Sequence, residues 1–153
     1  MLRTLGVVFA LVVPLWFFGQ ASPGDSKTIR RVDDSEALAV FAQDTHAPVP
    51  STPAGWIVNV ARYDGHIVRV GFVRKDSYAE FTGGSGEAFL ETYAGKGSVE
   101  GTVDVSGTLW RRFRTVDDHT SLIRDVAGVT LIVGGIRETA TEAELAELAA
   151  TVR

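Results

Sequence analysis

From residue 56 onward, β-branched and aromatic residues alternate with polar ones in short runs that turn residues separate. Alternation with a period of two is typical of strands that bury side chains by face, so each run predicts a β-strand. Seven strands are expected, over residues 56–63, 66–74, 78–82, 98–105, 108–115, 120–126 and 129–135. Most links between them are too short for a parallel crossover, which predicts antiparallel pairing.

The first two runs flank Asp64-Gly65, a pair favoured at the centre of a type I′ hairpin turn. Around such a turn, one face of the hairpin would carry Ile57, Ala61, Tyr63, His66, Val68, Val70 and Phe72. The other face would carry Trp56, Val58, Val60, Ile67 and Val73. Because both faces are apolar, we expect helices, or the proline-rich connector 46–55, to cover both sides of the sheet.

Three segments have the apolar spacing and the end signals of helices. The first covers residues 33–44, with Asp34 or Ser35 as N-cap and Leu38, Val40 and Phe41 as apolar contributors. The second covers residues 87–94, and Gly95 ends it. The third covers residues 141–153, with a Thr141/Glu144 capping box and with Leu145, Leu148 and Val152 on one face. The element order is therefore α-βββ-α-ββββ-α. This order predicts an α+β domain, with helices packed on a predominantly antiparallel sheet of about seven strands.

The amino terminus carries an apolar run without charges from Thr4 to Gly19. The run is short for a membrane helix and slightly long for the core of a cleaved signal peptide. Cleavage after the small residues of Gly19-Gln20-Ala21 stays open as an alternative. We expect residues 1–21 to form an uncleaved signal anchor, which is one transmembrane helix, and residues 22–32 to form a polar stalk. Residues 33–153 would then be an extracytoplasmic domain of a single-pass plasma-membrane protein.

Composition excludes several classes of function. The chain has no cysteine and a net charge of −4. A mildly acidic domain is a poor polyanion binder, so no nucleic-acid partner is expected. The three histidines lack the spacing of metal ligands, so neither a metal nor another cofactor is expected.

The segment LWRRFRT, residues 109–115, is the one stretch that looks like a binding surface. In a strand, Trp110, Arg112 and Arg114 would point one way, and Leu109, Arg111 and Phe113 the other. If residues 116–118 turn a hairpin, Arg112 lies opposite Leu122 and Arg111 opposite Ile123. The favoured interpretation is structural: the arginine stems cover the sheet, and their heads pair with acids such as Asp104, Asp117, Asp118 and Asp125. The alternative is a ligand or partner site at Trp110, Arg112 and Arg114.

No catalytic constellation is expected. Residues 117–121, DDHTS, contain an acid, a histidine and a serine, but triads assemble from distant segments and no GxSxG motif is present. In AGKGS, residues 94–98, Lys96 is followed by glycine after a helix, so the phosphate-loop pattern fails. GGSG, residues 83–86, is interpreted as a flexible start and cap of the second helix.

Several segments together resemble a known family: DSKTIRRVD, PAGWIVNVARY, VRVGFV, YAEFTGG, GTLWRRF, DHTSLIR, VTLIVGG and ELAELAATVR, after an apolar start with VVPL. The chain resembles, over essentially its whole length, an actinobacterial family of small membrane-tethered proteins, domain of unknown function 4245. The resemblance implies one amino-terminal anchor and an extracytoplasmic α+β domain. It implies no catalytic residues.

These observations favour a non-catalytic envelope domain that binds an unidentified envelope protein or ligand and meets the membrane through its amino-terminal helix. A carrier of lipid or another apolar molecule is an alternative, which requires an internal apolar cavity of several hundred Å³. A tethered hydrolase that uses Asp118 and His119 is a further alternative.

Overall fold

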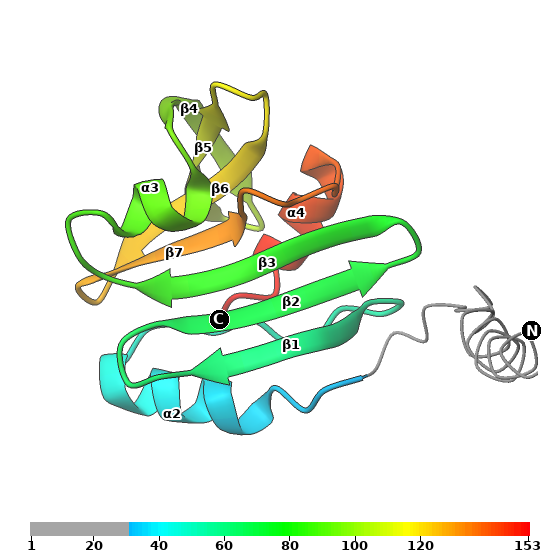
Figure 1. The fold of residues 1–153 in the computed structure, drawn as a ribbon, viewed down its shortest axis with the longest axis vertical. Coiled ribbons are helices and arrows are strands. Elements are labelled where there is room, and N and C mark those ends of the chain that lie inside the picture. Colours follow the sequence, from blue (N-terminus) through cyan, green and yellow to red (C-terminus); the bar gives the residue numbers. More distant parts are fainter. Residues whose placement is uncertain (1–30) are drawn as a thin grey trace, which may run out of the picture.

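A computed structural model of the chain describes residues 31–153 (Figure 1). The predicted membrane helix, and the stalk except for its last two residues, lie outside this range. Within the range, no helix combines the length and apolarity needed to cross a membrane.

The predicted order of elements is confirmed. The helices are α2 (Ser35–Thr45), α3 (Phe89–Ala94) and α4 (Glu142–Ala149). The strands are β1 (Ile57–Tyr63), β2 (Val68–Arg74), β3 (Ser77–Gly84), β4 (Gly97–Val105), β5 (Thr108–Thr115), β6 (Thr120–Val126) and β7 (Val129–Gly134). All neighbouring strands are antiparallel, in the order β1-β2-β3-β7-β6-β5-β4. The chain thus makes one meander, passes through α3 to the far edge, and makes a second meander that returns beside β3.

Helices pack on both faces of the sheet, although the first hairpin, from which this cover was predicted, has a helix on one face only. Helices α2 and α4 cover one face, and their buried residues Leu38, Phe41, Leu145 and Leu148 belong to the larger core cluster. Helix α3 covers part of the other face through a smaller cluster of Phe89, Ala94, Phe113, Ile123 and Ile132. On the face of the sheet that α3 covers, Figure 1 shows no helix of residues 31–153 over β1 and β2. This uncovered side of β1–β3 is called the open face below.

The first hairpin differs from its prediction at two points. The backbone N–H of Asp64 donates to the carbonyl of Ile67, so Gly65 and His66 are the central turn residues, one position later than expected. Gly65 has the expected positive φ, at 89°. A β-bulge between Val58 and Val60 also reverses the alternation, which places Trp56 and Val58 in the larger core rather than on the opposite face.

Two further predictions were wrong in detail. Val40 is 40% exposed, so it is not a core residue of α2. Gly83 and Gly84 lie inside β3 rather than in a flexible lead-in to α3. A Cβ atom on Gly83 would come within 2.6 Å of the Phe41 ring, and one on Gly84 within 2.7 Å of the Phe89 ring. These glycines are therefore needed for close packing of helices on both faces.

Helix α4 begins with the predicted capping box of Thr141 and Glu144. The carboxylate of Glu144 accepts hydrogen bonds from Thr141 N–H, the Ser77 hydroxyl and the Arg74 guanidinium. The Thr141 N–H is the main cause that lowers the pKa of Glu144 from 4.5 to about 2; partial burial opposes the shift, and the Ser77 and Arg74 bonds add to it. The cap therefore ties α4 to the end of β2 and the start of β3.

We expect this cap to make stability depend on pH. A lowered pKa in the folded state stabilises the fold fully above about pH 4.5, and this contribution is lost as the pH falls towards 2. Urea unfolding over that range should show a smaller loss for Glu144→Gln than for the wild type. Glu147→Gln is the control, because Glu147 also pairs with Arg74 but is 40% exposed. Parallel pH profiles for the wild type and Glu144→Gln would contradict this assignment.

Candidate functional site

Strand β5 carries the predicted arginine segment, and the predicted register is confirmed. Arg111 lies opposite Ile123 and Arg112 opposite Leu122. Every arginine of the strand pairs with a carboxylate. Arg111 pairs with Asp125, Arg112 with Glu142 at the start of α4, and Arg114 with both Glu100 and Asp118.

The three residues of the predicted ligand site have separate surroundings. Trp110 is 1% exposed and belongs to the larger core. Arg112 reaches α4, whereas Arg114 reaches β4 and the turn after β5. Their arrangement agrees with the structural interpretation of the strand. A binding role for the three residues stays a prediction.

Alanine substitution in this strand separates the two interpretations. Arg112→Ala should lower the free energy of unfolding by about 1 kcal/mol, because its stem packing is lost and Glu142 loses its partner. Arg124→Ala on β6 is the control, since Arg124 makes no ion pair within residues 31–153. Thermal melting is measured beside a pull-down from envelope extract. An Arg112→Ala protein of full stability that loses a specific partner would favour the ligand site instead.

The histidine of the DDHTS segment has a partner that the sequence did not indicate. His119 Nδ1 lies 2.8 Å from Glu138 Oε2, whose side chain is 7% exposed. Within residues 31–153, Glu138 Oε2 is buried and accepts no hydrogen bond of regular geometry. Burial raises the pKa of Glu138, and the Thr120 N–H and His119 oppose the rise.

The acid and the serine of that segment contact other residues than Glu138. Asp118 pairs with Arg114, and the buried Ser121 hydroxyl accepts a hydrogen bond from Gly135 N–H. The acid, histidine and serine therefore have three different partners. Within residues 31–153, no group of three or more His, Asp or Glu side chains is arranged to hold a metal ion.

The open face is organised around the carboxylate of Glu80, whose side chain is 10% exposed. Arg69 donates to it from both Nε and Nη2 at 2.9 Å, and the hydroxyls of Tyr78 and Thr82 each donate at 3.0 Å. Burial first, and then the charge of Glu80, raise the pKa of Tyr78 to about 12, so this hydroxyl keeps its proton. Four donors on one carboxylate fix the plane of the Arg69 guanidinium.

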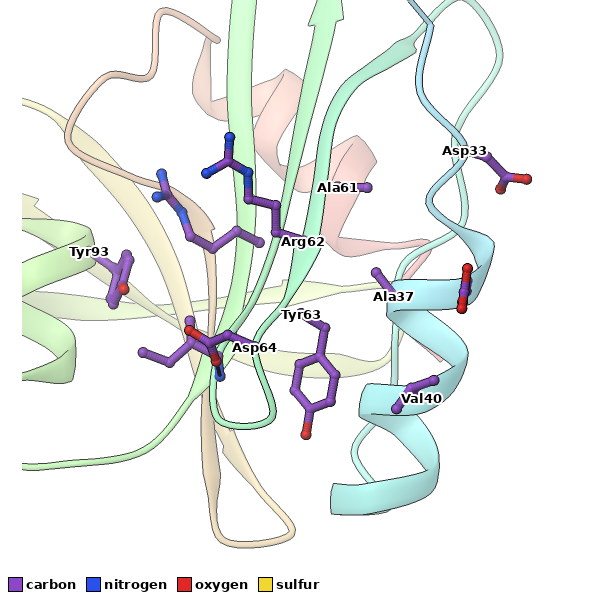
Figure 2. Close-up of a pocket in the computed structure, with 11 residues that line it drawn as sticks. Asp33, Ala37, Val40, Ala61, Arg62, Tyr63, Asp64 and Tyr93 are labelled. Atoms are coloured by element: carbon purple, nitrogen blue, oxygen red, sulfur yellow. Dashed lines mark hydrogen bonds between the residues drawn. The ribbon is translucent and has the colours of Figure 1, made fainter.

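Two adjoining hollows share Arg69 and Tyr93 as lining residues. The guanidinium carbon of Arg69 lies 5.4 Å from the centre of the Tyr93 ring. The first hollow has a volume of about 700 Å³ and lies between α2, the β1–β2 hairpin and Tyr93 (Figure 2). The second, about 350 Å³, continues over β3 towards Gly134 and Arg137. Both volumes fall within the range of small-molecule sites.

Arg62 completes the cationic side of the first hollow. It lies directly opposite Arg69 in the β1–β2 ladder. Within residues 31–153, its guanidinium takes part in no ion pair and no hydrogen bond. Figure 2 shows Asp33, at the rim, with its carboxylate directed away from Arg62. The site therefore presents one fixed and one uncommitted guanidinium.

Comparison with known proteins gives one match. The model of a family described as "Protein of unknown function (DUF4245)" matches residues 1–152. No curated protein and no solved structure matches the chain significantly. Because the family model covers the chain from its first residue to its penultimate one, the protein belongs to the DUF4245 family.

Proposed function

We propose that the protein is a membrane-tethered domain of the cell envelope that binds a ligand in two adjoining hollows, which run from the open face of β1–β3 around the edge of β1 to α2, without catalysing a reaction on it. The observation that carries the proposal is the pair of adjoining hollows that share Arg69 and Tyr93. Their walls come from a sheet and two helices, and rigid walls are typical of sites that exist before a ligand arrives.

The chemistry of the open face supports binding rather than catalysis. Glu80 accepts four hydrogen bonds, and Tyr78 keeps its proton. All four hydrogen bonds to the Glu80 carboxylate come from side chains of the protein itself, so the carboxylate is engaged in structure. These groups instead hold Arg69 in one orientation.

The tether is supported by the uncharged segment from Thr4 to Gly19. We expect the full-length chain in membrane fractions, and we expect protease added to spheroplasts to digest the folded domain. A cytoplasmic protein that stays intact in the same sample is the control. A mature protein that begins at Ser22 and is free of the membrane would show that the segment is a cleaved signal.

A substitution that fills the first hollow tests the binding site. We expect a ligand to copurify with the full-length protein, and Ala37→Trp should remove it, because Ala37 of α2 lines this hollow. Ala39→Trp is the matched control, because Ala39 is exposed on the same helix but does not line the hollow. Native mass spectrometry of the membrane-extracted proteins makes the measurement. Equal retention of the same molecule by both variants would exclude the first hollow as the site.

A further inference from the structure

The arginine pair of the first hollow is unfavourable in the isolated domain. Arg62 and Arg69 are direct cross-strand partners, and like charges in that position destabilise a sheet. Glu80 neutralises Arg69, but the charge of Arg62 has no counterpart within residues 31–153. An uncompensated guanidinium beside another one, on a chain of net charge −4, is an expected feature of an anion site.

The acids near this hollow leave the arginine pair available. Asp33, Glu36 and Asp64 line it, and none of them forms an ion pair with Arg62. The Asp64 carboxylate accepts hydrogen bonds from the N–H groups of His66 and Ile67, so it is committed to the turn. Asp33 points away in Figure 2 and accepts from Ser35 N–H.

The remaining wall of the first hollow is largely apolar. It consists of Ala37, Val40, Ala61 and Ile67, with the rings of Tyr63 and Tyr93. Val40 is a large apolar side chain that α2 leaves 40% exposed, and it faces this hollow rather than the core. Ala61 and Tyr63 lie on the α2 side of β1, whereas Arg62 points to the open face, so the hollow has a cationic part on the open face and an apolar part that continues around the edge strand β1 to α2.

We propose that the first hollow binds an amphipathic anion, with its phosphate or carboxylate group on Arg62 and Arg69 and its apolar body passing the edge of β1 to lie against α2. This inference rests on the proposed function and names the ligand chemistry of that site. The guanidinium groups offer planar sets of donors that match the oxygens of such a head group. Tyr93 and Glu80 hold Arg69 in place, while Arg62 supplies the free charge.

The size and rim of the hollow favour one small molecule over an extended polyanion. About 700 Å³ accommodates a ligand of small-molecule size. The rim carboxylates of Asp33 and Glu36 would repel a chain of phosphates that continued past the arginine pair. The head group could come from a free amphiphile or from a membrane lipid, and both share this chemistry.

The test uses the full-length protein in phosphatidylcholine nanodiscs, titrated calorimetrically with hexyl phosphate. We expect saturable binding that Arg62→Gln weakens at least about tenfold, as for the loss of a charge-assisted hydrogen bond. Hexyl glucoside, which has the same apolar chain without the charge, should bind at least about tenfold more weakly. Inorganic phosphate should also bind more weakly, because it has no apolar body. Arg124→Gln is the control, since Arg124 lies on β6 outside this hollow.

Two further measurements identify the source of the head group and distinguish failure of the anion proposal from failure of the proposed binding site. Phosphatidylglycerol in the nanodiscs would compete with hexyl phosphate if the natural ligand is a bilayer lipid, and would leave its affinity unchanged if the ligand is a free amphiphile. Absent binding, or equal binding of hexyl phosphate by the wild type and Arg62→Gln, overturns the anion assignment. If Ala37→Trp still removes a copurified molecule in that case, the binding site stands and only its ligand chemistry is wrong.

Discussion

Replacing Trp110 by alanine should lower the free energy of unfolding by about 3–5 kcal/mol, the usual cost of removing a large buried aromatic side chain. Trp110 is 1% exposed and lies in the core that α2 and α4 cover. Its removal would leave a cavity between β5 and its neighbours that surrounding side chains can fill only in part. Urea unfolding followed by far-ultraviolet circular dichroism measures the change.

Leu109 provides the matched control for Trp110. It is the preceding residue of the same strand, and it is 66% exposed. Leu109→Ala should therefore change stability by less than about 0.5 kcal/mol. If Trp110→Ala proved as mild as Leu109→Ala while abolishing capture of a partner, Trp110 would be a ligand contact, as the alternative interpretation of the sequence holds.

Replacing Glu80 by alanine should cost about 2–3 kcal/mol, because Arg69, Tyr78 and Thr82 all lose their common acceptor. Breaking a fully buried ion pair costs about 3–5 kcal/mol. The expected value is lower because the Arg69 side chain is 44% exposed and can be hydrated. Chemical denaturation measures stability, and amide exchange in β2 and β3 reports whether the open face loosens.

Glu100 is the control for Glu80. It also pairs with an arginine, Arg114, but its side chain is 42% exposed. Glu100→Ala should therefore cost at most about 1 kcal/mol. A cost for Glu80→Ala no larger than that for Glu100→Ala would contradict the view that Glu80 organises the open face.

The sequence predicted the parts of the fold that depend on local signals. The capping box of α4 is made by residues three apart, and the β5–β6 register follows from a short turn. The pairing of β3 with β7 could not be predicted in this way. These strands are joined through α3 and three other strands, so no turn between them specifies their register.

The bulge in β1 explains the error in assigning faces. A strict period of two places Trp56 on the side opposite Tyr63, whereas the structure buries both Trp56 and Val58 in the larger core. One extra residue in a strand reverses the predicted face of every residue beyond it, counted from the turn. Asn59 carries no strong sequence signal for a bulge. The turn, in contrast, lies one position later than predicted, which shifts the pairing by two residues. Tyr63 therefore lies opposite Val68, and both residues keep their predicted face.

The candidate site was missed for a different reason. Arg62, Arg69 and Glu80 come from three strands, and Tyr93 comes from a helix. Alternation alone could have placed Arg62 and Arg69 on one face of the first hairpin. Neither Glu80 as the partner of Arg69 nor Glu138 as the neighbour of His119 follows from spacing along the chain.

The meeting of the two meanders at β3 and β7 has a consequence for how the protein acquires its structure. Paired residues of these strands, such as Glu80 and Gly134, are roughly fifty positions apart, and contacts at such separation slow folding. Until β7 has been synthesised, β3 has an unpaired edge, which can pair with another chain. The second hollow needs both Glu80 and Gly134, so this part of the candidate site can form only when the sheet closes at its centre.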